Sequence, residues 1–165
     1  MCQAFCFSKC LRFWNFIFRA FRGYNNGMLK LWKLEGEGSE PLCLPDMSSL
    51  DAVTHSLPGG FYSTFRTFQQ RTRVLGLRAH LDRLYRPAAS LRLQPAVSSG
   101  ELRRRISMLL SDFPVQEARV RVILSAEDRS GSVYLAVEAL HLLPDSVYRQ
   151  GVRTITMPFQ RQHPA

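Results

Sequence analysis

Between residues 59 and 91 the spacing of apolar side chains changes from every second residue to nearly every fourth residue. A strand followed by a helix is the structure that fits both spacings. Alternation over residues 61–68 places Tyr62, Thr64 and Arg66 on one face of a strand, and Ser63 and Phe65 on the other. A polar turn at 69–72 and a short strand at 74–77 follow. The apolar stripe of the predicted helix then consists of Leu77, Leu81, Leu84, Ala88 and Leu91.

The rest of the chain repeats this mixture of strand and helix signals. Before residues 59–91 we expect a strand at 28–34 and a loop with short extended pieces at 35–58. After them, the capping box of Ser98 and Glu101 begins a second helix. Strands are then expected at 119–124 and 132–140, joined by a turn at 127–131, followed by a connection at 142–150 and a strand at 152–157. We therefore expect an α+β fold. It comprises a small antiparallel or mixed sheet with two helices, plus a last strand that the family resemblance given below assigns to a truncated second domain.

Pro87 interrupts the first predicted helix four residues after Arg83. Proline has no N–H, and its ring crowds the carbonyl four residues earlier, at a cost of about 3 kcal/mol in a regular helix. We expect a kink or an early helix end at this position.

Composition is that of a globular chain, with 45% hydrophobic and 21% charged residues among 165. The net charge of +9 is concentrated at the front, because residues 1–34 hold six basic residues and no acidic one. The remaining residues hold 16 basic and 13 acidic side chains, so the body of the protein is close to neutral. We divide the chain into a basic amphipathic segment at 1–27, a small domain at 28–141, and residues 142–165, which the family resemblance given below assigns to an interdomain linker and the start of a truncated large domain.

Aromatic and basic residues interleave at helical spacing within residues 1–27. Such a helix can lie in a membrane interface, dock on a partner, or pack on its own domain. A further interpretation is translated sequence upstream of a start at Met28, because the turn signal at 25–27 separates the two parts.

Cysteines occur at positions 2, 6, 10 and 43, without a paired CxxC motif or zinc-like spacing. Neither a metal site nor a disulfide scaffold is predicted. No run of about 18 apolar residues occurs, so neither a spanning helix nor a cleaved signal peptide is expected. The default interpretation is a cytoplasmic protein with reduced thiols.

The segment His80–Leu84 reads HLDRL and follows the aromatic strand and turn directly. In this order the motifs resemble the cofactor-phosphate region of class IV aminotransferases, the branched-chain and D-amino-acid type that uses pyridoxal 5'-phosphate. Residues 158–165 resemble the run that leads into the catalytic lysine of that family. The resemblance covers about residues 28–165 and about the first half of a family member.

The resemblance implies roles for four residues. Arg83 stands where the family's arginine holds the cofactor phosphate, which suits a guanidinium because its forked donors bind phosphate bidentately. Tyr62 stands at the position of an active-site aromatic, Arg66 at that of a basic strand residue, and Arg121 at that of an arginine near the substrate. The family commonly has a glutamate where this chain has Ser63, which leaves the local hydrogen bonding open.

By resemblance, the activity is transfer of an amino group from an amino acid to a 2-oxo acid. The chain holds three lysines, Lys9, Lys30 and Lys33, all upstream of the phosphate region. Since the Schiff base needs a primary amine, and the family's lysine would come just beyond Ala165, we expect weak cofactor binding and no turnover by these 165 residues. Full-length family members commonly form homodimers.

Two alternatives remain at this stage. An aminodeoxychorismate lyase shares the same architecture, and nothing in the residues separates it from a transaminase. The other is a small Arg-rich module that binds nucleic acid or anionic lipid through residues 1–27 and the triplet Arg103–Arg105. We expect that triplet to be solvated on the outer face of its helix.

Overall fold

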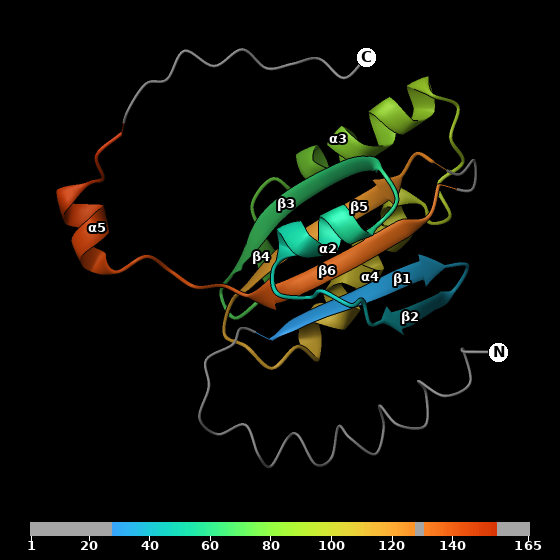
Figure 1. The fold of residues 1–165 in the computed structure, drawn as a ribbon. Coiled ribbons are helices and arrows are strands. Elements are labelled where there is room, and N and C mark those ends of the chain that lie inside the picture. Colours follow the sequence, from blue (N-terminus) through green and yellow to red (C-terminus); the bar gives the residue numbers. More distant parts are fainter. Residues whose placement is uncertain (1–27, 128–130, 155–165) are drawn as a thin grey trace.

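The computed structural model describes residues 28–127 and 131–154, which form an antiparallel sheet with helices on both faces (Figure 1). The strands are β1 (Leu29–Glu35), β2 (Gly38–Leu42), β3 (Gly60–Phe68), β4 (Arg73–Val74), β5 (Ala118–Ser125) and β6 (Val133–Ala139), and the helices are α2 (Leu50–Ser56), α3 (Leu77–Ser90), α4 (Ser99–Ser111) and α5 (Asp145–Gln150). In the described residues the sheet has the order β2-β1-β6-β5-β3-β4, and all its pairs are antiparallel. The predicted α+β class is confirmed.

The predictions for residues 1–27 and 158–165 lie outside the described residues. Within them, the strands expected at 28–34, 61–68, 119–124 and 132–140 are confirmed to within two residues at each end. The strand expected at 152–157 is absent from residues 152–154, the part of it that the structure describes.

One face of the sheet is covered by α3 and α4, which lie above and behind the strands in Figure 1. The apolar core on this face is formed by Leu81, Leu84 and Ala88 of α3, Leu102, Ile106 and Leu110 of α4, and Val120, Val122, Leu124, Val133, Leu135 and Val137 of the central strands. The predicted stripe of α3 is thus confirmed in its middle. Leu91 is exposed instead, because it follows the end of the helix.

The opposite face carries the short helix α2 over a smaller apolar cluster that includes Leu50, Val53 and Ile123. The loop expected at 35–58 is therefore wrong at α2. Ser49 starts the helix, its Oγ accepting a hydrogen bond of 3.1 Å from the N–H of Ala52. A helix of two turns shows too little periodicity to be recognised, and its stability comes from packing on the sheet.

Gly60 begins β3 at a close approach to β5. A Cβ atom at this position would lie 2.1 Å from the carbonyl oxygen of Leu124, so no other residue fits without moving a strand. Gly60 therefore allows the pairing of β3 with β5.

Helix α3 continues through Pro87 to Ser90, so the early end expected there is wrong. Leu84 and Ala88 on either side of the proline are fully buried in the core. Their packing holds the helical backbone across the hydrogen bond that the proline cannot donate. A bend at this position stays a prediction.

The connection expected at 142–150 contains the helix α5, which stands away from the sheet in Figure 1. No residue of α5 is buried. Leu142, Leu143, Tyr148 and Val152 expose large apolar side chains along this segment. Residues 142–154 thus contribute nothing to the apolar core between the sheet and its helices.

Candidate functional site

The alternation predicted for β3 places Tyr62, Thr64 and Arg66 on the face that α2 covers. Thr64 pairs directly with Arg121 of β5, and the two side chains share that face. The guanidinium of Arg121 lies 4.8 Å from the ring centre of Tyr62, in cation–π geometry. Tyr62 is 56% exposed. The structure therefore brings together two of the predicted substrate residues, Tyr62 and Arg121.

Arg121 is 7% exposed and is bound mainly by α2. Its Nη1 donates to Asp51 Oδ1 at 2.7 Å, Thr54 Oγ1 at 2.8 Å and the carbonyl of Leu50 at 3.0 Å. Its Nε donates to Thr64 Oγ1 at 2.8 Å. The hydrogen bond from Arg121 lowers the pKa of the Asp51 carboxyl group. Arg121 thus anchors α2 to the sheet, a role that the sequence did not reveal.

Arg66 lies on the same face of the sheet as Tyr62 and Arg121, but it takes no part in the contact between them. Its guanidinium packs 4.4 Å from the ring centre of Phe68, and its buried Nε has no hydrogen-bond partner among the described residues. Directly opposite on β5 is Arg119, which forms an ion pair with Glu138 of β6. The structure shows no direct contact of Arg66 with Tyr62 or Arg121.

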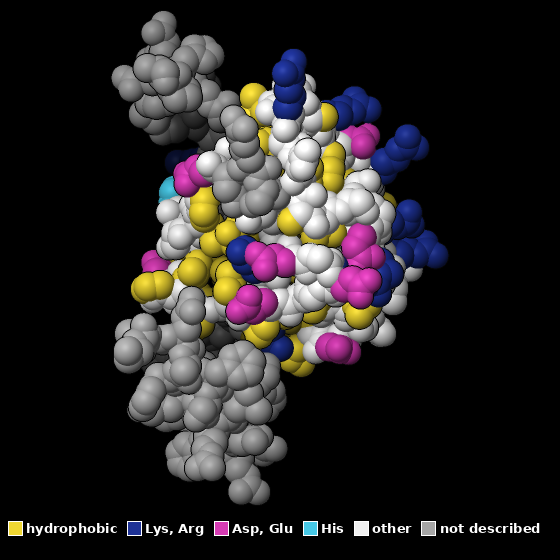
Figure 2. Space-filling view, turned by 90° about the vertical axis from the view of Figure 1, so that its right-hand side faces the viewer, with side chains coloured by type: hydrophobic (Ala, Val, Ile, Leu, Met, Phe, Trp, Pro, Cys, Tyr) yellow, Lys and Arg dark blue, Asp and Glu magenta, His cyan; other side chains and the backbone are white. Residues whose placement is uncertain are grey.

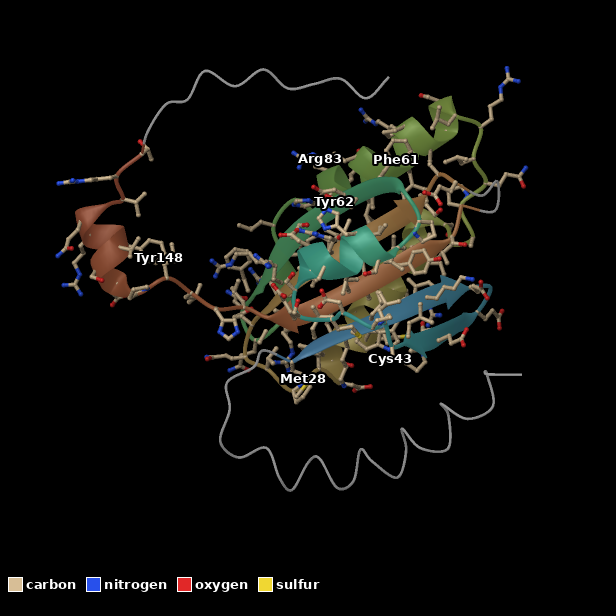
Figure 3. The ribbon with its side chains drawn as sticks, in the orientation of Figure 1. Met28, Cys43, Phe61, Tyr62, Arg83 and Tyr148 are labelled. Atoms are coloured by element: carbon tan, nitrogen blue, oxygen red, sulfur yellow. The ribbon has the colours of Figure 1, made fainter. Side chains whose placement is uncertain are left out.

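Arg83 lies on α3, the helix that packs on the other face of the sheet, and Figure 3 shows it extending from α3 while Tyr62 extends from β3. Its side chain is exposed, and it has no hydrogen bond or ion pair with any described residue. All five guanidinium donors are therefore available to a ligand. The phosphate role that the family resemblance implies for Arg83 stays a prediction. It requires free donors of this kind, because a guanidinium bound to protein oxygens could not take a phosphate bidentately.

Ser63, which stands where the family commonly has a glutamate, forms a hydrogen bond with His80 of α3. Its Oγ lies 2.8 Å from Nδ1 of His80, the histidine of the HLDRL motif. The His80 ring also packs 5.2 Å from the ring of Phe65. Burial, and then the charge of Arg83, lower the pKa of His80, which favours a neutral imidazole at pH 7. The pair ties β3 to the turn of α3 that precedes Arg83.

Of the triplet Arg103–Arg105, which was expected to be solvated, Arg105 is buried while the other two are exposed. Arg105 is 2% exposed, and its Nε donates to Glu101 Oε1 at 2.7 Å. Its Nη1 donates to the carbonyl of Gly38 at 2.5 Å, and its Nη2 to that of Gly36. Arg105 therefore joins α4 to the turn between β1 and β2, and the expectation of solvation is wrong for it.

Glu101 holds two of these arginines at the start of α4. Its N–H donates to Ser98 Oγ at 3.2 Å, so Ser98 is the predicted cap. Its carboxylate accepts from Arg104 and Arg105, and these hydrogen bonds lower its pKa to about 2. The spacing of Glu101 and Arg105, four residues apart, is the signal that could have indicated their ion pair.

The two lysines of the described residues lie on β1, three strands from β3 in the sheet order. At a spacing of about 4.8 Å per strand, β1 and β3 are about 14 Å apart. Lys33 Nζ pairs with Glu35 Oε1 at 2.5 Å, and Lys30 Nζ lies 5.6 Å from the ring centre of Phe113. The register places Lys33 on the same face of the sheet as Tyr62, in the row Lys33–Tyr134–Ile123–Tyr62 and three strands away from it. Lys30 lies on the opposite face, with Phe113.

Other kinds of site are not seen in the part of the chain that the structure describes. That part holds no group of three or more His, Cys, Asp or Glu side chains suited to a metal ion. It also holds no helix with the length and hydropathy needed to cross a bilayer. In Figure 2, apolar side chains gather on the left of the view, and most of the Lys and Arg side chains lie at its top and right, with acidic side chains between them.

Comparisons with known proteins give a family from a sequence profile and a fold from solved structures. The sequence profile described as Amino-transferase class IV matches residues 60–165. No curated protein sequence matches the chain. A solved structure of a putative branched-chain amino acid aminotransferase from Thermotoga maritima is similar, with a TM-score of 0.52 and 24% identity over 70% of this chain. A fold IV transaminase from Curtobacterium pusillum has a TM-score of 0.51 and 17% identity over 69% of this chain.

This chain spans 39% of the length of the first of these proteins and 43% of the second. The two structures share its fold, and the profile match covers more than half of its residues, including β3, the HLDRL helix and Arg121. The chain therefore belongs to the class IV aminotransferase family.

Proposed function

We propose that these residues form the small domain of a pyridoxal-phosphate-dependent aminotransferase, with Arg83 as a clamp for the cofactor phosphate. The observation that carries the proposal is the exposed guanidinium without a partner, on the helix where the family motif has its arginine. When bound, the cofactor supplies the electron sink for amino transfer. The contribution of this chain is to bind and orient the phosphate.

Tyr62, Arg66 and Arg121 are our candidates for the substrate side. Tyr62 offers an exposed aromatic surface, held at its inner side by the guanidinium of Arg121. Because Arg121 is bound to α2, we assign it the role of positioning Tyr62 and of placing positive charge beneath a substrate carboxylate. Arg66 adds a second positive charge on this face, with an unpaired Nε.

The substrates in this proposal are an amino acid and a 2-oxo acid, and the working protein is a cytoplasmic homodimer. Neither lysine of the described residues is our candidate for the Schiff base, because Lys30 and Lys33 lie on β1, three strands from β3. The exposed apolar side chains of residues 142–154 support a division at residue 142, where a linker to a large domain begins. An aminodeoxychorismate lyase of the same fold is the alternative chemistry.

Binding to nucleic acid or anionic lipid through the triplet Arg103–Arg105 has less support. Arg105 is buried and Arg104 pairs with Glu101, so Arg103 is the one member without a protein partner in the described residues. One unpaired arginine gives a weak, shallow salt dependence rather than the steep dependence of an extended phosphate contact.

The test is a titration of the 165-residue protein with pyridoxal phosphate, followed by calorimetry, beside an assay of amino transfer. We expect weak binding that R83A removes and R86A retains, because Arg86 lies one turn further along α3 and pairs with Asp82. We expect no amino transfer. Equal binding by wild type and R83A would refute the clamp, and turnover by the wild type would refute the assignment of the lysine.

A further inference from the structure

The hydrogen bond between Ser63 and His80 bears on which nitrogen of His80 carries the proton. Ser63 is 5% exposed, and Nδ1 of His80 is the one hydrogen-bond partner of its hydroxyl among the described residues. If Nδ1 carried the proton, the Ser63 hydroxyl would accept it, and its own hydrogen would be buried without an acceptor. The arrangement that satisfies both groups has Ser63 donating to Nδ1, which leaves the ring proton on Nε2.

The Nε2–H of His80 is consequently a donor without a protein partner. His80 is half-buried, its ring is held by Ser63 and by the ring of Phe65, and no described residue accepts from Nε2. Its neighbours on β3, Ser63 and Phe65, are uncharged. The charged group that acts on it is Arg83, three residues further along α3.

Residues three apart on a helix lie on the same side, with Cβ atoms about 5–6 Å apart. His80 and Arg83 therefore present two sets of unpaired donors next to each other. A phosphate monoester has three terminal oxygens, so it can accept from the guanidinium fork and from an imidazole N–H at the same time.

We propose that His80 is a second donor of the anion site at Arg83, and that Ser63 is the positioning residue that fixes the donating tautomer. The ligand class is a phosphate monoester, and the inference rests on the proposed function of Arg83 as the phosphate clamp. Ser63 is thus matched to this site: a carboxylate at its position would accept from Nδ1–H and give the opposite tautomer in a neutral imidazole.

The first test is the tautomer itself, measured by ¹⁵N NMR of the imidazole in the full 165-residue protein without phosphate at pH 8. We expect a protonated Nε2 and an unprotonated Nδ1 for His80, and loss of this preference in S63A. A protonated Nδ1 in the wild type would overturn the proposal.

The second test is a titration with inorganic phosphate, followed by NMR, in the wild type and two variants of His80. In H80Q the side-chain amide can donate from near the Nε2 position, whereas in H80N it reaches only the Nδ1 position next to Ser63. We expect H80N to weaken phosphate binding about fivefold to tenfold and H80Q to weaken it less than twofold.

Controls separate this inference from the proposed function. R86A should bind like the wild type, and R83A should bind more weakly than H80N. If R83A loses binding while H80N retains it, the clamp stands and the role of His80 is refuted. If R83A also retains binding, or the wild type binds no phosphate, both proposals fail. Matching amide spectra of H80N and H80Q will show that the variants are folded.

Discussion

Arg105 on α4 and Arg83 on α3 are the same residue type on the two long helices of one face, yet they have opposite environments. Arg105 is buried, and each of its three nitrogens donates to an oxygen of the protein. Arg83 is exposed, and none of its nitrogens has a partner in the described residues. An arginine that holds the fold uses its donors internally, whereas the arginine that we propose as a phosphate clamp has all of its donors free.

The comparison predicts that R105A has the largest effect on stability. It removes a buried cation and leaves the carbonyls of Gly36 and Gly38 without their donors, so we expect the free energy of unfolding to fall by about 3 kcal/mol. Urea denaturation measures the change. R103A, an exposed neighbour on the same helix, should change stability by less than about 0.5 kcal/mol. Equal effects of R103A and R105A would contradict the structural role of Arg105.

Arg121 tests whether a candidate substrate residue can also hold the fold. R121A removes hydrogen bonds to α2 and to Thr64, and we expect a loss of about 2 kcal/mol. Hydrogen exchange should increase in α2, while α4 on the other face stays protected. If the amides of α2 keep their protection in R121A, the anchoring role is wrong.

The ion pairs of Glu101 with Arg104 and Arg105 should make the stability of the protein depend on pH. The pKa of Glu101 is about 2 in the folded protein, against 4.5 as the ordinary value, because Arg104 and Arg105 donate to its carboxylate. A lowered folded pKa gives stability that is present above the unfolded pKa and is lost as pH falls through the folded pKa. We expect the free energy of unfolding to decline between pH 5 and about pH 2, with a smaller decline in E101Q. Parallel pH profiles of wild type and E101Q would contradict this assignment.

Arg83 should give the smallest effect on the ligand-free protein. R83A removes no hydrogen bond or ion pair within the described residues, so the free energy of unfolding should change by less than about 0.5 kcal/mol. Thermal unfolding with and without inorganic phosphate sharpens the contrast. Phosphate should raise the melting temperature of the wild type and leave that of R83A unchanged. A large loss of stability in ligand-free R83A would remove the distinction between the two arginines.

Much of the fold followed from short patterns. Alternation over 61–68 predicted both faces of β3, and the stripe through Leu81 and Leu84 predicted the buried side of α3. Ser98 was recognised as a cap because capping depends on residues three positions apart. Helix α2 was missed since two turns carry little periodic signal, and the helix past Pro87 was missed since core packing outweighs the local penalty.

Of the candidate site, residue types and faces were predictable but contacts were not. Tyr62, Arg66 and Arg121 were expected on the substrate side, and the structure places all three on one face of the sheet. Arg121 proved to be bound by α2, and Ser63 proved to bind His80, 17 residues away. Neither contact could be predicted from neighbouring residues in the sequence, because each joins two elements that are separated by a turn or by other strands.

The amino-acid sequence by itself determined the spacing of the elements, the family motif around Arg83 and the polarity of each strand face, because these depend on residues close together along the chain. Only the tertiary structure decided which arginines donate hydrogen bonds to oxygens of the protein and which have none. Arg105 meets Gly38 and Gly36 across 67 and 69 residues, a contact that exists once the β1–β2 turn and α4 are packed together. The partners of a long, flexible cation are set by whichever oxygens the fold brings within reach, and those oxygens come from distant parts of the chain.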